Sequence, residues 1–121
     1  MLRVYSYDKC GTCRNAIKWL TANGIAFELI PIVTNPPDVQ ELAEWIPRSE
    51  KPIGKWFNTS GEKYRELGMK DRMATMTEVQ KIELLASEGK LIKRPIISDG
   101  VRVTVGFDVS EFERVWVGGV T

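Results

Sequence analysis

The chain has 121 residues, of which 43% are hydrophobic and 27% charged, and its formal net charge is +1. This length suits one domain, residues 1–121, with enough chain to bury a core. The balanced charge predicts neither direct nucleic-acid binding nor membrane binding, and no stretch has the apolar length of a membrane-spanning helix. The N-terminus lacks a signal-peptide pattern, so we expect a cytoplasmic protein whose thiols stay reduced.

The first predicted elements are a strand, a helix and a second strand. Residues 2–7 are rich in side chains that favour strands, and residues 12–22 carry an apolar stripe at helical spacing. Asn23 and Gly24 are typical of a helix end, and residues 26–30 predict the second strand. A helix between two strands favours parallel pairing, so this segment predicts a β-α-β unit.

A helical insertion is predicted to follow, over residues of about 37–90. Pro37 or Asp38 is suited to begin a helix with an apolar face, and Pro47 is expected to stop it. Residues 51–70 are polar and dotted with glycine, which predicts one or two short helices. A capped start at Thr77 then predicts a helix that continues up to Gly89.

The last third of the chain changes to a strand pattern. Residues 94–98 and 101–105 flank Asp99 and Gly100, a pair that favours a two-residue hairpin turn. Residues 107–116 predict a closing helix. The resulting order, β-α-β, helices, β-β-α, is that of an α/β thioredoxin-like fold with a helical insertion between the second and third strands.

The two cysteines fall in the turn between the first strand and the first helix. Cys10 and Cys13 are separated by Gly11 and Thr12. Free backbone N–H groups and the positive end of the helix dipole favour a thiolate there. In a reducing compartment a Cys-x-x-Cys pair is more often catalytic or sensory than structural. Two buried structural thiols remain the alternative interpretation.

Two other uses of cysteine fit the sequence poorly. A structural zinc site needs four ligands, whereas the chain has two cysteines and no histidine, so we expect no metal site. A phosphatase-type loop places an arginine six residues after the cysteine, and Ala16 stands there. The pattern therefore points to thiolate or thiol–disulfide chemistry.

Several segments resemble the arsenate reductase (ArsC)/Spx/YffB family of thioredoxin-fold proteins, and they follow one another in the family's order. They are residues 10–16, 35–37, 64–69, 91–96 and 105–107. The resemblance spans nearly the whole chain. It implies that Cys10 is the nucleophile and leaves Cys13 available as a resolving thiol.

The same resemblance implies how a substrate is held. Arg94 matches an arginine that contacts the oxyanion, and Pro95 matches a cis-proline beside the thiol. Gly11, Thr12 and Arg14 match the start of the helix behind the nucleophile and are expected to bind substrate. Without the resemblance, Arg94 would be interpreted as an exposed arginine and Pro95 as a trans proline at the start of a strand.

Two positions depart from the pattern of true arsenate reductases. Asn58 falls where they carry a second oxyanion-binding arginine, and no arginine occurs near Gly106, where they carry a third. Because a dianion leaving water needs charge-assisted hydrogen bonds, these departures predict weak arsenate turnover.

Three functions follow as hypotheses. The favoured one is a thiol-dependent reductase of a small oxyanion or disulfide substrate, with no bound cofactor and with glutathione/glutaredoxin or thioredoxin as the external thiol donor. The second is an Spx-like redox-sensing regulator, in which a Cys10–Cys13 disulfide switches binding to RNA polymerase. The third is a binding or scaffold domain with vestigial thiols.

Overall fold

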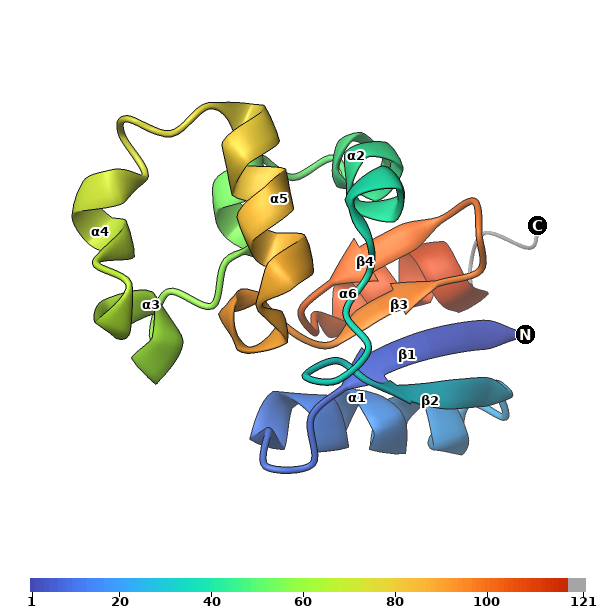
Figure 1. Ribbon diagram of the computed structural model, residues 1–121. Coiled ribbons are helices and arrows are strands. Elements are labelled where there is room, and N and C mark those ends of the chain that lie inside the picture. Colours follow the sequence, from blue (N-terminus) through green and yellow to red (C-terminus); the bar gives the residue numbers. More distant parts are fainter. Residues whose placement is uncertain (118–121) are drawn as a thin grey trace.

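The computed structural model describes residues 1–117 as a four-stranded sheet with helices on both faces (Figure 1). The strand order is β2-β1-β3-β4, with β1 parallel to β2 and antiparallel to β3, and with β3 antiparallel to β4. The predicted thioredoxin-like α/β arrangement is confirmed. The strands are β1 (Leu2–Ser6), β2 (Phe27–Pro31), β3 (Ile96–Ser98) and β4 (Val103–Val105).

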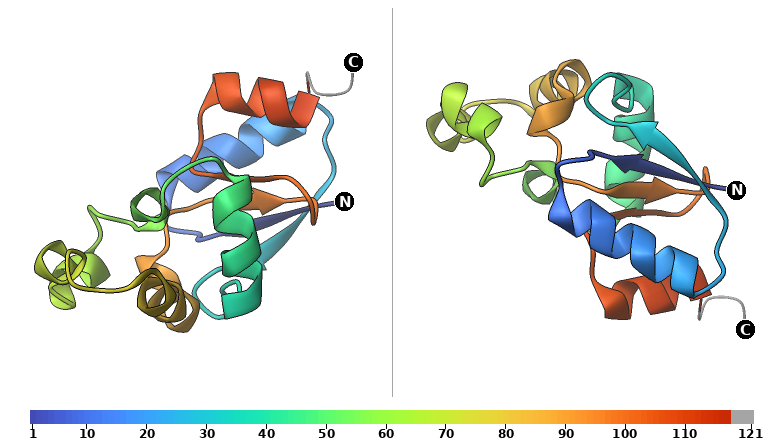
Figure 2. Two further views of the ribbon diagram at one scale, coloured as in Figure 1. Left: turned by 90° about the horizontal axis from the view of Figure 1, so that it is seen from above. Right: turned by 90° about the horizontal axis from the view of Figure 1, so that it is seen from below.

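The helices form two layers around this sheet. Helix α1 (Gly11–Ala22), α6 (Val109–Phe112) and the following π-helical turn η3 (Glu113–Val117) cover one face (Figure 2). The insertion between β2 and β3 covers the other face, mainly through α2 and α5. Its elements are α2 (Val39–Arg48), η1 (Ile53–Trp56), α3 (Glu62–Glu66), α4 (Met69–Arg72), α5 (Glu78–Ser87) and η2 (Gly89–Leu91).

Alternation along β1 explains why the protein has two apolar cores. Val4 is fully buried and packs in the layer formed by α1 and α6, together with Leu20 and Phe112. Tyr5 points to the opposite face, where its ring meets the ring of Trp45 at 5.8 Å between centroids. Successive strand residues face opposite sides, so one strand serves both cores.

Capping boxes define where two helices of the insertion begin. The Asp38 carboxylate accepts a 2.8 Å hydrogen bond from the N–H of Glu41, and the Glu41 side chain accepts one from the N–H of Asp38. Thr77 and Gln80 form the same reciprocal pair at the start of α5. Each pair satisfies N–H groups that a helix leaves open, and the start predicted at Thr77 is confirmed.

The prediction that Pro47 stops the second helix is wrong. Pro47 lies inside α2, and the backbone N–H of Ser49 donates to the carbonyl of Trp45 at 2.9 Å. Proline lacks an N–H, so in the last turn it removes one helical hydrogen bond without preventing the next.

The predicted two-residue hairpin turn is also wrong. Ser98 pairs with Val103, which leaves four residues in the loop. The Asp99 carboxylate accepts hydrogen bonds from the backbone N–H groups of Val101 and Arg102, closing a wider loop than Asp99 and Gly100 alone would form. Side-chain bonding of this kind competes with the tighter turn.

Two further boundaries differ from the prediction. Asp108 caps α6 through the N–H of Glu111, so the closing helix begins at Val109, two residues later than expected, and it then widens into η3. Strand β2 pairs over Phe27–Pro31, shifted by one residue, because Leu2 of β1 pairs with Phe27.

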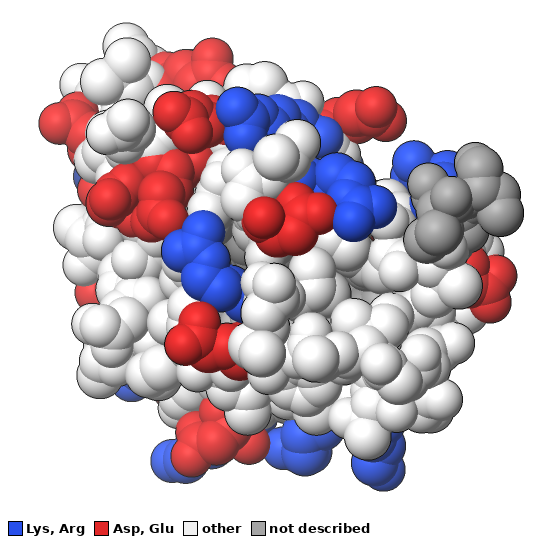
Figure 3. Space-filling model, turned by 90° about the vertical axis from the view of Figure 1, so that its right-hand side faces the viewer, with Lys and Arg blue, Asp and Glu red and all other residues white. Residues whose placement is uncertain are grey.

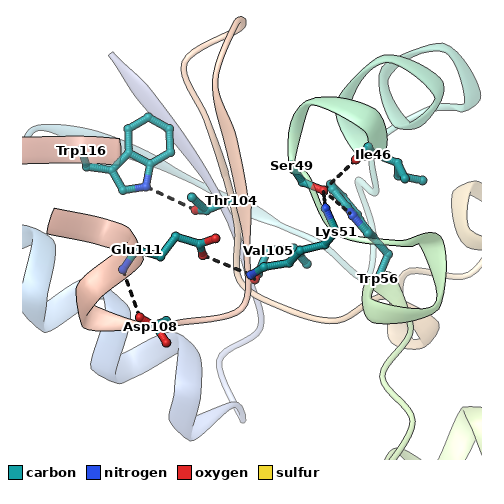
Figure 4. A network of polar contacts seen from close by, with 9 residues as sticks. All are labelled: Ile46, Ser49, Lys51, Trp56, Thr104, Val105, Asp108, Glu111 and Trp116. Atoms are coloured by element: carbon teal, nitrogen blue, oxygen red, sulfur yellow. Dashed lines mark hydrogen bonds and ion pairs between the residues drawn. The ribbon is translucent and has the colours of Figure 1, made fainter. Parts of the chain in front are cut away.

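A polar network joins the insertion to β4 and α6 (Figure 4). The ammonium of Lys51 donates to the carbonyl of Val105 at 3.0 Å and to the Glu111 carboxylate at 3.1 Å. The Ser49 hydroxyl accepts from the Trp56 indole N–H at 3.1 Å. These bonds anchor the insertion beside the end of β4.

The surface at the hairpin end of the sheet mixes charges of both signs, and acidic and basic side chains lie close together there (Figure 3). Across residues 1–117, no helix is both long enough and apolar enough to cross a membrane.

Candidate thiol site

The loop between β1 and α1 places Cys10 at the N-terminal cap of α1. The backbone N–H of Cys10 donates to the carbonyl of Tyr7 at 3.1 Å, which closes the turn. The Cys10 sulfur then accepts the backbone N–H of Cys13 at 3.2 Å. Cys10 is partly exposed, whereas Cys13 is 1% exposed. One thiol is therefore open to solvent and the other lies beneath it, and no disulfide joins them in the structure.

The environment drives the two thiol pKa values apart. Burial acts to raise the pKa of Cys10, but hydrogen bonds from the side chain and N–H of Cys13 and the charged guanidinium of Arg94 outweigh it, so that pKa lies below its usual value. Burial, together with the hydrogen bond and the negative charge at Cys10, raises the pKa of Cys13 to about 11. The outer thiol is thus the more acidic of the two and the better suited to react as a thiolate.

A short backbone bridge joins two segments of the insertion beside the thiols. Phe57 pairs antiparallel with Ile92, and the N–H of Lys93 donates to the carbonyl of Trp56 at 2.8 Å. The N–H of Asn58 donates to the carbonyl of Leu91, also at 2.8 Å. This bridge sets Asn58 opposite the segment that precedes β3.

These elements enclose a pocket of about 280 Å³ over the Cys10 sulfur. Two cations, Lys93 and Arg94, contribute to its wall, and none of the lining residues described within 1–117 is acidic. The lining residues are Cys10, Thr12, Phe57, Asn58, Thr59, Ser60, Lys93 and Arg94. Hydroxyl, amide and cationic groups can all donate to a negatively charged ligand.

Four of the residues predicted for the site meet in this pocket: Cys10, Thr12, Asn58 and Arg94. Pro95 is buried directly after Arg94, and the Arg94–Pro95 peptide bond is cis, as the resemblance implies. The carbonyl of Pro95 accepts the N–H of Gly106 at 2.9 Å, so the end of β4 supports this segment.

Gly11 and Arg14 do not line the pocket. The guanidinium of Arg14 turns back to the loop and donates to the carbonyl of Asp8 at 3.1 Å. It borders a different, mainly apolar hollow beside Ile17 and Leu29.

Sequence reasoning missed Lys93 as a pocket residue. Its side chain lies over Gly106, where the Cβ of any larger residue would stand 3.1 Å from the Lys93 Cε atom. Gly106 has φ 83°, a conformation that favours glycine. The sequence places Lys93 beside Arg94, and that adjacency was the available signal.

The described part of the chain holds no cluster of three or more His, Cys, Asp or Glu residues placed to bind a metal. The site consists of two thiols next to a pocket whose wall includes two cationic side chains. Together with the sheet order, this arrangement defines a thioredoxin-like protein with a Cys-x-x-Cys centre at the start of its first helix.

The chain belongs to the ArsC family, whose family model matches residues 5–115. It is 49% identical to the uncharacterized protein YusI of Bacillus subtilis, over 95% of this chain and 98% of that one. It is 29% identical to the global transcriptional regulator Spx of Streptococcus agalactiae, over 92% of this chain and 80% of that one.

Solved structures agree with this assignment. An ArsC family related protein from Bacteroides fragilis superposes with a TM-score of 0.90 and is 44% identical, over 93% of this chain and 95% of that one. A protein from Streptococcus mutans described as a possible arsenate reductase superposes with a TM-score of 0.83 and is 38% identical, over 88% and 91% of the two chains.

Proposed function

We propose that the protein is a thiol-dependent oxidoreductase that reduces a small oxyanion or disulfide substrate, with Cys10 as nucleophile and Cys13 as resolving thiol. The observation that carries this proposal is the pairing of an activated outer sulfur with a buried inner thiol under a pocket lined by Lys93 and Arg94. The Streptococcus mutans relative supports a reductase of the arsenate type.

In the first step with a disulfide substrate, the Cys10 thiolate attacks one sulfur of the substrate disulfide. A new sulfur–sulfur bond forms, the substrate's bond breaks, and the departing thiolate takes a proton from water. Cys13 then loses its proton and attacks the Cys10 sulfur, which releases the second substrate thiol. The substrate gains two electrons, and the protein is left as a Cys10–Cys13 disulfide.

With arsenate, the Cys10 thiolate attacks arsenic and an oxygen leaves as water. Attack by Cys13 on the Cys10 sulfur leaves the electron pair of the sulfur–arsenic bond on arsenic, which departs as arsenic(III). In both reactions the protein disulfide must be reduced again. We propose glutathione with glutaredoxin, or thioredoxin, as the external thiol donor, with no bound cofactor.

The pocket supports an anionic substrate because its charges are unbalanced. Within residues 1–117, no ion pair holds the Lys93 ammonium, and Arg94 faces the Cys10 sulfur. Arginine and lysine both bind oxyanions, arginine through its planar fork and lysine as a point charge. With Asn58 at the wall in place of a further cation, we expect weak binding of an arsenate dianion.

Thiol consumption in the presence of arsenate, and separately of 2-hydroxyethyl disulfide, tests the proposal. Each donor is supplied in turn, and Cys10→Ser and Cys13→Ser are matched variants. We expect slow turnover that Cys10→Ser abolishes, and a substrate adduct on Cys10 that accumulates in Cys13→Ser. Absence of turnover with both substrates and every donor would overturn the proposal.

The similarity to the transcriptional regulator Spx supports a second candidate function. The chain matches Spx over 92% of its length, and a Cys10–Cys13 disulfide could change a protein-binding surface. In this alternative the protein is a redox-sensing regulator that binds RNA polymerase. Binding of purified RNA polymerase by one redox form only would support it, whereas equal absence of binding in both forms would exclude it.

A further inference from the structure

We propose that Tyr7 is a positioning residue that holds the Arg94 guanidinium against the Cys10 sulfur. The inference rests on the proposed thiol function and adds a residue that neither the motif nor the pocket lining identifies. Tyr7 belongs to the loop before α1 and Arg94 to the segment before β3, so the contact joins the two sides of the site.

The contact is a cation over an aromatic ring. The guanidinium carbon of Arg94 lies 4.8 Å from the centroid of the Tyr7 ring. That separation is within the range of about 6 Å in which a ring face attracts a cation. The side chains of Tyr7 and Arg94 are both half-buried, so water weakens this attraction less than it would on an open surface.

A ring at this place leaves the hydrogen-bonding edge of the guanidinium free. Arg94 uses Nη1 to donate to the carbonyl of Lys90 at 3.3 Å, and its guanidinium, which lines the same pocket as Cys10, lowers the pKa of the Cys10 thiol. Guanidinium hydrogen bonds lie in the plane of the group, whereas a cation–ring contact uses its face. The ring and the Lys90 carbonyl therefore restrict the side chain without competing for Cys10.

The backbone of Tyr7 contacts the same pair of thiols. Its carbonyl accepts the N–H of Cys10 at 3.1 Å, and its backbone acts to lower the pKa of the Cys13 thiol, against the effect of burial. One residue thus fixes the turn that carries the nucleophile and orients the cation that faces it. Restricting a long arginine side chain in the folded protein lowers the entropy lost when its charge engages the thiolate.

The alternative is that Tyr7 only packs against the core, where it touches the insertion's apolar cluster. A double-variant experiment separates the two roles, because a packing defect acts whether or not Arg94 is present. The readout is the rate at which iodoacetamide alkylates Cys10 as a function of pH. It requires no knowledge of the substrate, so it stays informative even if no reductase activity is found.

We expect Tyr7→Leu to lower the alkylation rate at mildly acidic pH about two- to fivefold and to move the titration midpoint upward. Tyr7→Phe keeps the ring and should stay close to the unmodified protein. In an Arg94→Met background, Tyr7→Leu should have no further effect. Arg102→Met is the matched control, because Arg102 lies over the Trp116 ring at 5.2 Å, outside the pocket.

Two results would overturn the assignment: an unchanged pH profile in Tyr7→Leu, or the same loss of rate in the presence and absence of Arg94. Far-UV circular dichroism and the thermal midpoint establish that each variant is folded. If Tyr7→Leu does not fold, Tyr7→Met is used instead, because its flexible apolar side chain fills irregular space without offering a ring face.

Discussion

The sulfur of Cys10 accepts the backbone N–H of Cys13 at 3.2 Å, so the helix turn that activates the first thiol also keeps the second within reach of it. The side chain of Cys13 also lowers the pKa of the Cys10 thiol. The inner thiol thereby stabilises the outer thiolate while its own proton is retained, with its pKa raised to about 11. This difference between the two thiols is what the proposed sequential attack requires.

This difference predicts unequal labelling of the two thiols. At roughly pH 6, where an ordinary thiol with a pKa of about 8.5 is almost fully protonated, iodoacetamide should modify Cys10 and leave Cys13 free. The lowered pKa of Cys10 and the 1% exposure of Cys13 are the reasons. Peptide mapping by mass spectrometry gives the order, and equal labelling of the folded protein would contradict it.

Arg94→Met should reduce the reactivity of Cys10 at acidic pH. The guanidinium lowers the pKa of the Cys10 thiol, so its loss moves the alkylation profile to higher pH and reduces the rate at pH 6 on the order of tenfold. Arg14→Met is the matched control, since Arg14 lies in the first turn of α1 but bonds to Asp8. A similar loss in both variants would show that net charge, and not the position of Arg94, sets the reactivity.

The ratio of the rates at which two alkylating agents modify Cys10 tests the charge of the pocket. Iodoacetate is anionic and iodoacetamide neutral, so their rate ratio at Cys10 reports on nearby cations independently of the thiolate fraction. Lys93→Met should lower this ratio, whereas Lys55→Met should not, because Lys55 lies on η1 outside the Cys10 pocket. An unchanged rate ratio in Lys93→Met would show that Lys93 does not contribute to the anion site.

Asn58→Arg should raise arsenate turnover. An arginine at this wall adds a charge-assisted contact to a dianion, which is expected to increase kcat/KM about ten- to hundredfold. Turnover of 2-hydroxyethyl disulfide, which is neutral, should change little. Efficient reduction of micromolar arsenate by the unmodified protein would instead show that Lys93, or backbone N–H groups, already complete the site.

The raised pKa of Cys13 predicts a loss of stability in alkali. The folded protein holds this proton more tightly than the unfolded chain, so the stabilisation is complete below about pH 8.5, the ordinary thiol pKa, and is lost as the pH rises toward 11. The free energy of unfolding should therefore fall less steeply with pH in Cys13→Ser than in the unmodified protein, measured under reducing conditions. Parallel slopes would contradict the assignment of the proton to Cys13.

Local signals predicted much of the fold correctly. The capping box at Thr77, the helix end at Asn23 and the position of Cys10 before a helix depend on residues a few positions apart, which the sequence displays directly. The wider loop at Asp99 and the continuation of α2 through Pro47 depend on particular side-chain and carbonyl partners, and propensity alone could not give them.

The site was predictable where the motif names a residue and unpredictable where tertiary contacts decide. Cys10 and Arg94 follow from the resemblance, and they meet in the structure. Lys93 lies at the pocket because the preceding residue, Ile92, pairs with Phe57, which is distant from it in the sequence. The spacing of apolar residues does not predict this pairing. Arg14 does not line the pocket, and its guanidinium donates to the Asp8 carbonyl, a contact that the motif does not reveal either.

Mass spectrometry of the protein after a single turnover tests the central claim most directly. Fully reduced protein is mixed with a stoichiometric amount of 2-hydroxyethyl disulfide, quenched with acid and mapped. We expect the loss of two hydrogens as a Cys10–Cys13 disulfide, and in Cys13→Ser a mixed disulfide confined to Cys10. Two free thiols after the substrate is consumed, or an adduct on Cys13 in place of Cys10, would contradict it.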